Sequence, residues 1–268
     1  MNESLTVTLL GTGTSQGVPV IGCTCPVCLS SDPQDRRLRT SIAIQADGPP
    51  IIVDIGPDFR QQMLRAGIND VAAVLLTHEH NDHVSGLDDI RPINFLHKKD
   101  ISVYGLERVL NELRHRYPYV FDPASDYPGR PRVDLHDIEA GGVLHINGVE
   151  VQALHVMHGP LPILGFRIGN FCYITDAKYL SQDVVDNIYG IDNLVINALH
   201  RRPHFSHLNL EEALELIERI NPGQAYLTHI SHDMGLAAAV NIELPERVSL
   251  AFDGLQLKAA YTKSSISA

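Results

Sequence analysis

The feature that most constrains this chain is a cluster of metal-binding side chains at the end of an apolar run. Residues 72–76 read AAVLL, a pattern typical of a buried β-strand, and the letters THEHNDH follow directly. Side chains of an extended segment alternate between faces, so His78 and His80 can bind one ion together. Asp82 and His83 can reach a second position close by. Imidazole nitrogen suits zinc, manganese or iron, and a carboxylate can bridge two ions, so the pattern predicts a metal site.

Other apolar runs end in the same kinds of side chain. Each such residue, taken alone, is explained equally well as a capping aspartate or a polar loop histidine. Loops at strand ends are, however, where functional sites are usually assembled, and together these residues complete a ligand set for two ions. They are Asp54 after PIIV, His158 in LHVMHG, Asp176 after FCYIT and His229 after AYLT.

The segment THEHNDHVSG resembles the H-x-H-x-D-H signature of the metallo-β-lactamase fold superfamily, and the order and rough spacing of the residues above match it across most of the chain. The resemblance implies an α/β (α+β) fold, a four-layer αββα sandwich. Strands and helices interleave and runs of consecutive strands also occur, which favours two mixed sheets with helices outside. We therefore expect residues 1–268 to form one hydrolase domain.

The same resemblance implies a role for each candidate residue. Asp176 is expected to bridge two divalent metal ions, and Asp54 to orient a ligand histidine. Asp82 is also placed among the catalytic residues. The types of the ligand residues alone do not tell whether these two ions are zinc or manganese. One ion is expected at His78, His80 and His158, and the other at Asp82, His83 and His229.

A second constellation lies in GCTCPVC, which places Cys23, Cys25 and Cys28 in a C-x-C-x₂-C array. Three thiols this close cannot all pair with one another, and disulfides are rare in the cytosol, where we expect this chain. A tetrahedral zinc site needs a fourth ligand, and His232 in THISHD can supply it. The array therefore predicts a structural zinc ion in a loop around residues 22–29.

Together, GTGTSQGVPVIGCTCPVC, LTHEHNDH and LTHISHD closely resemble the PhnP-like phosphodiesterase family. The resemblance implies a hydrolase that cleaves a small cyclic or linear phosphodiester with a hydroxide held by two metal ions. It also implies a histidine before a late helix that protonates the leaving group. His207 in HFSHLNLEEAL is our first candidate, because it precedes a predicted helix start that would favour an anionic phosphate. His204 and His200 remain rivals.

Other hydrolases of this fold, and one kind of protein without hydrolytic activity, are alternatives. A tRNA 3′-processing nuclease shares the chemistry but would need a basic arm for RNA. A thioesterase has a similar two-metal site without this cysteine array. A PqqB-like protein of quinone-cofactor biosynthesis shares the array but departs from the full ligand pattern, so it would act as a carrier or in cofactor synthesis. All seven active-site ligand positions are filled here, which favours hydrolysis.

Composition limits the partners. Of the 268 residues, 44% are hydrophobic, and the net charge is −11 with neutral histidines. Nucleic-acid binders usually carry a basic surface, so we expect a small phosphodiester substrate rather than a nucleic acid. No run approaches the ~18 apolar residues of a membrane span, and the first residues do not read as a secretory signal. We expect a cytoplasmic protein without membrane contact, and a homodimer on the family resemblance alone.

Two segments are expected to flank the cleft and to select the substrate. Residues 86–99 are interpreted as a loop, and the stretch 117–132 as an extended loop or lid because it is rich in Pro and Tyr. A helix is predicted over LNLEEALELIERI, with Asn209 as its N-cap.

Overall fold

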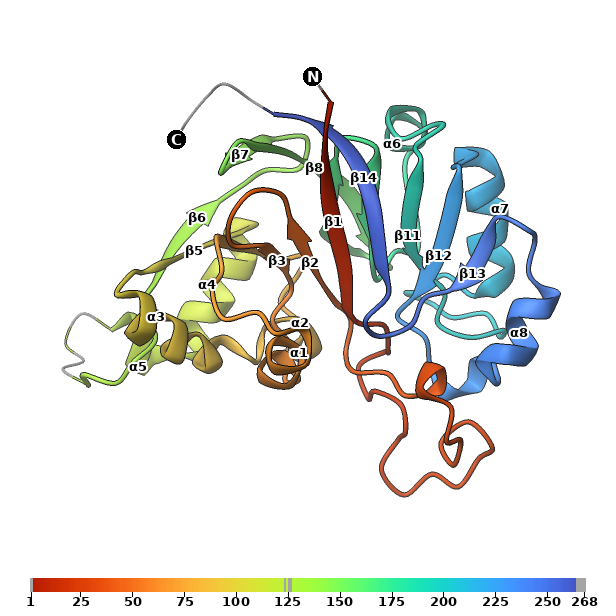
Figure 1. The fold of residues 1–268 in the computed structure, drawn as a ribbon, viewed down its shortest axis with the longest axis horizontal. Helices are drawn as coiled ribbons and strands as arrows, with labels where there is room; N and C mark the ends of the chain where they lie inside the picture. The colour runs from red at the N-terminus through yellow and green to blue at the C-terminus, as the bar shows by residue number, and fades with distance from the viewer. Residues whose placement is uncertain (1, 123, 125–126, 264–268) are drawn as a thin grey trace.

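The structure is a computed structural model that describes residues 2–122, 124 and 127–263. Two mixed β-sheets stand side by side, and helices cover the outer side of each (Figure 1). The first sheet has the strand order β14-β1-β2-β3-β4-β5-β6, in which β3 to β6 run parallel. Its strands are β1 (Asn2–Gly11), β2 (Ser41–Gln45), β3 (Ile51–Val53), β4 (Ala73–Leu75), β5 (Ile101–Gly105), β6 (Val133–Asp137) and β14 (Gln256–Thr262).

The second sheet has the order β13-β12-β11-β10-β9-β8-β7. The strands β10 to β13 run parallel, whereas β7 to β10 pair antiparallel. Parallel neighbours end at the same edge of a sheet, so the loops that follow β3, β4, β10 and β12 are brought to common edges. The strands are β7 (Val143–Ile146), β8 (Val149–His158), β9 (Leu161–Ile168), β10 (Phe171–Ile174), β11 (Asn193–Asn197), β12 (Gln224–Thr228) and β13 (Val248–Leu250).

The helices divide between the two outer faces. The first sheet is covered by α1 (Phe59–Ala66), α2 (Asn81–Val84), α3 (Arg91–His97), α4 (Glu107–Arg116) and α5 (Pro118–Phe121), and the second by α6 (Gln182–Asn187), α7 (Leu210–Ile220) and α8 (Ala237–Glu243). Short 3₁₀ turns lie at η1 (Pro33–Asp35), η2 (Leu87–Ile90) and η3 (His232–Met234). The expected four-layer αββα sandwich is confirmed.

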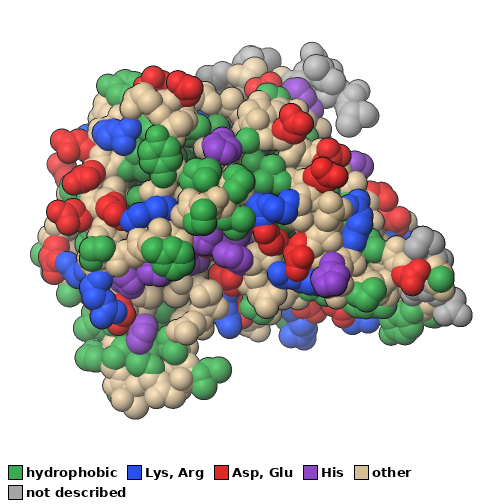
Figure 2. Space-filling view, turned by 180° about the vertical axis from the view of Figure 1, so that it is seen from behind, with side chains coloured by type: hydrophobic (Ala, Val, Ile, Leu, Met, Phe, Trp, Pro, Cys, Tyr) green, Lys and Arg blue, Asp and Glu red, His purple; other side chains and the backbone are tan. Residues whose placement is uncertain are grey.

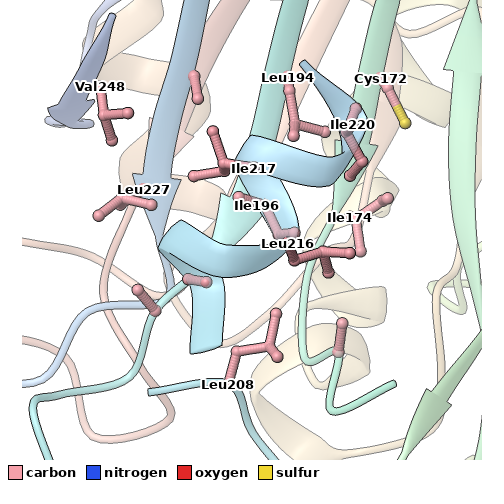
Figure 3. Packing of buried hydrophobic residues seen from close by; sticks show 14 of the residues in the cluster. Cys172, Ile174, Leu194, Ile196, Leu208, Leu216, Ile217, Ile220, Leu227 and Val248 are labelled. Carbon is pink, nitrogen blue, oxygen red and sulfur yellow. The ribbon is translucent and has the colours of Figure 1, made fainter. Parts of the chain in front are cut away.

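Three apolar clusters hold the layers together. The middle one lies between the sheets and includes Leu75, Phe166 and Tyr173, all of them fully buried. One outer cluster packs the first sheet against its helices. The other places Leu216 and Ile217 of α7 over strands of the second sheet (Figure 3). A fully buried leucine or isoleucine contributes ~1.5–3 kcal/mol, so these clusters fix the strand ends on which the site depends.

Helix α7 begins as predicted. The side chain of Asn209 accepts a hydrogen bond from the backbone N–H of Glu212, and the Glu212 carboxylate accepts one from the backbone N–H of Asn209. This reciprocal capping box satisfies two donors that a helix start otherwise leaves free.

The two segments interpreted as loops contain helices. Residues 86–99 hold η2 and α3, and the stretch 117–132 holds α5. The interpretation of 86–99 as a loop is wrong, whereas in 117–132 only the first residues are helical and residues 123, 125 and 126 lie outside the described ranges. Pro92 and Pro118 both lie in the first turn of a helix, where a missing N–H removes no hydrogen bond. None of the helices in the described ranges combines the length and apolar character needed to cross a bilayer.

Candidate metal centre

The candidate ligands lie where strands of both sheets end. Asp54 follows β3, the THEHNDH segment follows β4, and His229 follows β12. His158 is the last residue of β8, and Asp176 lies just beyond β10. Figure 2 shows histidine side chains gathered in the middle of one face of the molecule, among hydrophobic and charged side chains. The expected convergence of distant segments is therefore present in the fold.

Three of these strand-end residues adopt an unusual backbone conformation. The φ angles of Asp54, Asp176 and His229 are 62°, 59° and 54°, in the left-handed region that residues other than glycine rarely occupy. Such a conformation costs about 1 kcal/mol or more and persists where the surrounding structure imposes it. Here it turns the backbone sharply at the end of each strand, so that the side chain enters the site.

The first group of side chains joins the two sheets. Ligand atoms of His78, His80, His158 and Asp176 all lie within 4.8 Å of one another. His78 Nε2 lies 2.9 Å from His80 Nδ1 and 3.7 Å from Asp176 Oδ2. The imidazole rings of His78 and His158 have centroids 5.5 Å apart. Three imidazoles and one carboxylate at this spacing form a donor set suited to a zinc or manganese ion.

The second group shares Asp176 with the first. Ligand atoms of Asp82, His83, Asp176 and His229 also lie within 4.8 Å of one another. His83 Nε2 lies 3.3 Å from Asp82 Oδ2 and 3.5 Å from Asp176 Oδ1. His229 Nε2 lies 3.3 Å from Asp176 Oδ2, so the two oxygens of this carboxylate face different histidines. Asp176 is placed as a bridging carboxylate would be.

Several buried ring nitrogens in this group have no hydrogen-bond partner in the described part of the chain. Among the described residues, His83 Nε2 and both ring nitrogens of His229 are buried and form no hydrogen bond. An unsatisfied buried polar atom costs about 1–3 kcal/mol, so native structures rarely leave several together. A cation in this group would bind His83 Nε2 and one nitrogen of His229. With the donor set of the first group, the residues present therefore fit a pair of divalent ions.

Neighbouring groups fix which nitrogen of each histidine faces the centre. His83 Nδ1 donates to Asp54 Oδ2 at 2.7 Å, and His158 Nδ1 donates to the backbone carbonyl of Ser206 at 2.8 Å. The hydroxyl of Thr77 lies 3.0 Å from His78 Nδ1 and itself donates to Asp54. These bonds leave the Nε2 lone pairs free for an ion. Asp54 thus contacts His83 as a residue that orients a ligand would, and the role implied by the resemblance stays a prediction.

Thr77 and Ser206 were missed by the sequence analysis. Thr77 is fully buried and directly follows an apolar strand, so a buried hydroxyl beside a ligand histidine was a usable signal. Ser206 contributes a backbone carbonyl, which no side-chain pattern reveals.

Neighbouring charges shift the pKa values of the buried carboxylates and of His83 in opposite directions. Burial alone would raise the pKa of Asp176, but His229 and His83 hold that pKa well below its usual range. Burial alone would lower the pKa of His83, but Asp176, Asp82 and Asp54 raise it well above the usual value. Burial, with the charge of His83, lowers the pKa of His78. These carboxylates therefore favour the charged form of the His83 imidazole.

His207 lies against both groups. Its ring centroid is 4.5 Å from that of His158 and 4.8 Å from that of His229, and its Nδ1 is 3.9 Å from Asp176 Oδ2. His204 lies one ring further out, 5.0 Å from His207, and His200 lies 5.9 Å beyond His204. Of the three candidate acids, His207 is thus the one in contact with the centre. Burial and the neighbouring His229 lower the pKa of His207 to about 2, so its imidazole is neutral near pH 7.

The start of α7 is not available to a phosphate. Glu212 occupies it through the capping box, and Lys178 Nζ lies 2.7 Å from the Glu212 carboxylate. The expectation that this helix start would favour an anionic phosphate at His207 is therefore not supported by the geometry.

The cysteine array and His232 form a third group. His232 Nδ1 lies 3.3 Å from the sulfurs of Cys23 and Cys25 and 3.6 Å from that of Cys28, and the four ligand atoms lie within 4.8 Å of one another. The cysteines are free thiols, and three sulfurs with one imidazole match a structural zinc site. A hydrogen bond from the backbone N–H of Cys28, together with His232, lowers the pKa of Cys25 to about 6.

Comparison with known proteins places this site in a family context. Residues 50–230 match the family model described as the beta-lactamase superfamily domain. A solved structure titled a new diphosphatase from the PhnP family is 37% identical, with a TM-score of 0.91, and the match covers 97% of this chain and 99% of that one.

Two curated relatives bear other names. The octanoyltransferase of Porphyromonas gingivalis is 42% identical over 250 residues, which cover 92% of this chain but only 50% of that protein. This chain thus spans half the length of that relative. The ribonuclease Z of Mycobacterium sp. (strain KMS) is 27% identical over 252 residues, 83% of each chain.

Proposed function

Because the chain belongs to the metallo-β-lactamase superfamily, we propose that it is a metal-dependent hydrolase of small cyclic or linear phosphodiesters. The observation that carries the proposal is the pair of side-chain groups that share Asp176. The PhnP-family name of the 37% identical structure supports phosphoryl chemistry. Because that name specifies a diphosphatase, diesters with a diphosphate linkage belong among the substrates to be tested.

The proposed ligand assignment follows the two groups. His78, His80 and His158 would hold one divalent cation, zinc or manganese, and Asp82, His83 and His229 the other. Asp176 would bind both. When bound, such a pair of cations supplies an acidified water molecule and positive charge opposite the phosphoryl oxygens. The array of Cys23, Cys25, Cys28 and His232 would hold a structural zinc.

Asp82 and His207 would act on the reacting atoms. His83 and His229 hold the pKa of Asp82 far below its usual value although burial opposes them, so its carboxylate stays ionised and can accept a hydrogen bond from the attacking water. His207 would place its ring beside the oxygen of the departing alcohol. Since this imidazole is neutral without substrate, its transfer of a proton to that oxygen requires the charge of a bound phosphodiester to raise its pKa.

A second candidate function is cleavage of RNA. It is favoured by the ribonuclease Z relative, which matches 83% of this chain. The net charge of −11 opposes it, because nucleic-acid affinity depends on cationic contacts to phosphates. A PqqB-like carrier would not need both groups of side chains complete, and here both are complete.

The test is a substrate panel with protein loaded with Zn²⁺ or Mn²⁺. It should include bis-p-nitrophenyl phosphate, 2′,3′-cyclic nucleotides, 1,2-cyclic ribose phosphates, a dinucleoside diphosphate and a tRNA precursor. We expect turnover of one or more small diesters and none of the RNA. Protein that holds two ions in the site yet turns over no diester would contradict the proposal and favour a binding protein.

A further inference from the structure

We propose that Arg108 is a positioning residue for the metal centre, and that it acts by fixing the segment that carries His80. The inference rests on the proposed function, because it takes the side chains described above to be metal ligands. Arg108 lies in the first turn of α4, outside both candidate ligand groups.

The guanidinium of Arg108 links the two halves of the site. Nη1 donates to Glu79 Oε1, and Nη2 donates to the backbone carbonyl of Pro162 at 2.6 Å. Glu79 lies between the candidate ligands His78 and His80, and Pro162 lies on β9, just beyond His158. One side chain on a helix of the first sheet therefore contacts the ligand segment and the strand hairpin of the second sheet at once.

His80 is the candidate ligand that most needs such support. His83 and His158 are buried, and each is oriented by an acceptor outside the ligand groups. His80 is exposed, and its Nδ1 contacts His78 Nε2 at 2.9 Å. That contact cannot persist with metal, because His78 Nε2 is the atom that would bind the ion. The position of His80 must then depend on the backbone around it.

The segment that carries His80 is held by contacts on both sides of Glu79 and at Glu79 itself. At its start, the N–H of Leu164 on β9 donates to the carbonyl of Thr77 at 3.0 Å. At Glu79, the fixed point is the ion pair with Arg108, in which the Glu79 side chain is 17% exposed and that of Arg108 37%. A partly buried, forked guanidinium contact holds geometry better than an exposed pair. Past Glu79, the backbone carbonyl of His80 accepts a hydrogen bond from the N–H of His83 at 2.9 Å. Removal of Arg108 would therefore loosen the short stretch between Thr77 and His80 rather than the whole segment.

The test is a Mn²⁺ titration of the full chain, followed by electron paramagnetic resonance. Mn²⁺ reports the imidazole and carboxylate positions because thiolates prefer softer ions. The variants are Arg108→Ala, Arg108→Lys and, as matched control on the same helix, Arg114→Ala, whose exposed guanidinium contacts Asn111. Loss of a group that orients a ligand weakens metal affinity ~10–100-fold.

We expect wild-type protein and Arg114→Ala to bind two Mn²⁺ with the same affinities. In Arg108→Ala, one of the two dissociation constants should rise at least ~10-fold while the other stays within ~2-fold, and Arg108→Lys should lie between, since lysine lacks the fork. Glu79→Gln should behave as Arg108→Ala does, and the double variant should be no worse than either. The thermal midpoint of each metal-free variant checks that it is folded.

Failure of the proposed function and failure of the inference on Arg108 would give different results. Wild-type protein that binds fewer than two Mn²⁺ would overturn the proposed function, and this inference with it. Wild-type protein that binds two, with Arg108→Ala equally tight at both positions, would leave the function standing and overturn the inference. A raised KM in Arg108→Ala with unchanged Mn²⁺ affinity would likewise overturn it, because Arg108 would then act on the substrate.

Discussion

Asp54 shows how one buried carboxylate determines the orientation of a candidate ligand. It accepts hydrogen bonds from the backbone N–H and hydroxyl of Thr77, both at 2.9 Å, and from His83 Nδ1 at 2.7 Å. In Asp54→Asn, an amide replaces an acceptor facing His83, so we expect affinity for one of the two active-site ions to fall ~10–100-fold. Calorimetric metal titration measures the change. Asp58→Asn, which alters a carboxylate paired with Arg39, is the control, and equal affinities in both variants would refute this role.

Cys25 and Cys28 should differ in reactivity in the metal-free protein. A backbone hydrogen bond and His232 lower the pKa of Cys25 to about 6, whereas burial raises that of Cys28 to about 11. Only the thiolate reacts with alkylating agents, so at pH 7 iodoacetamide should modify Cys25 well before Cys28. Peptide mass spectrometry gives the order, and prior loading with Zn²⁺ should protect both. Modification of Cys28 first, or no protection by zinc, would argue against the shared site.

The loops after β3 and β4 meet so closely that a methyl group would separate them. A Cβ on Gly56 would lie 1.9 Å from the backbone oxygen of Asp82. Gly56→Ala should therefore displace Asp82 and His83 and weaken the binding of one active-site ion. The free energy of unfolding should also fall by ~1–3 kcal/mol. Gly105→Ala is the control, because its nearest neighbour would be 3.5 Å away. Metal analysis and urea unfolding measure both effects, and a Gly56→Ala protein with normal metal content would show that this contact is not required.

Much of this arrangement was predictable from the sequence. Apolar runs ending in His78, Asp176 and His229 predicted strands with candidate ligands at their ends, because hydrophobic pattern and residue type are local properties. The resemblance to a known superfamily then supplied which distant segments meet. Helix α3 was missed in the segment 86–99, although Pro92 is compatible with a first helical turn.

The contacts between segments were beyond a single sequence. The pairing of Arg108 with Glu79 spans 29 positions, and nothing local marks either residue as a partner of the other. The backbone carbonyl of Ser206 that orients His158 carries no residue-type signal. The occupied start of α7 differs from these, because Glu212 stands three residues after the predicted N-cap Asn209 and that spacing is a local signal of a capping box.

The whole molecule should respond to pH through its buried histidines. Burial lowers the pKa of His78 and His80, and that of His207 to about 2, so an unfolded chain, with ordinary values near 6.5, binds protons that the folded chain excludes. Stability then rises as the pH rises toward 6.5. His83 has a raised pKa, so it is protonated in both states over this range and subtracts stability only above it.

We therefore expect the free energy of unfolding of the metal-free protein to increase between pH ~4 and ~6.5, by up to about 1.4 kcal/mol per pH unit for each imidazole that stays neutral only in the folded chain. Burial raises the pKa of Asp54, which opposes part of this increase. Urea unfolding at a series of pH values measures it. His207→Asn removes one of the shifted groups and should flatten the rise. A stability that falls over this range would mean that these imidazoles are not buried as neutral groups.

Side chains from both sheets are proposed to hold two ions in one centre, and the group of three cysteines and His232 a separate third ion. Elemental analysis of metal-replete protein by inductively coupled plasma mass spectrometry tests this proposal most directly, with Asp176→Ala alongside because Asp176 belongs to both active-site groups. We expect three ions per wild-type chain and, in Asp176→Ala, only the one that the thiols hold. A wild-type chain with a single ion, or an Asp176→Ala chain that keeps all three, would contradict it.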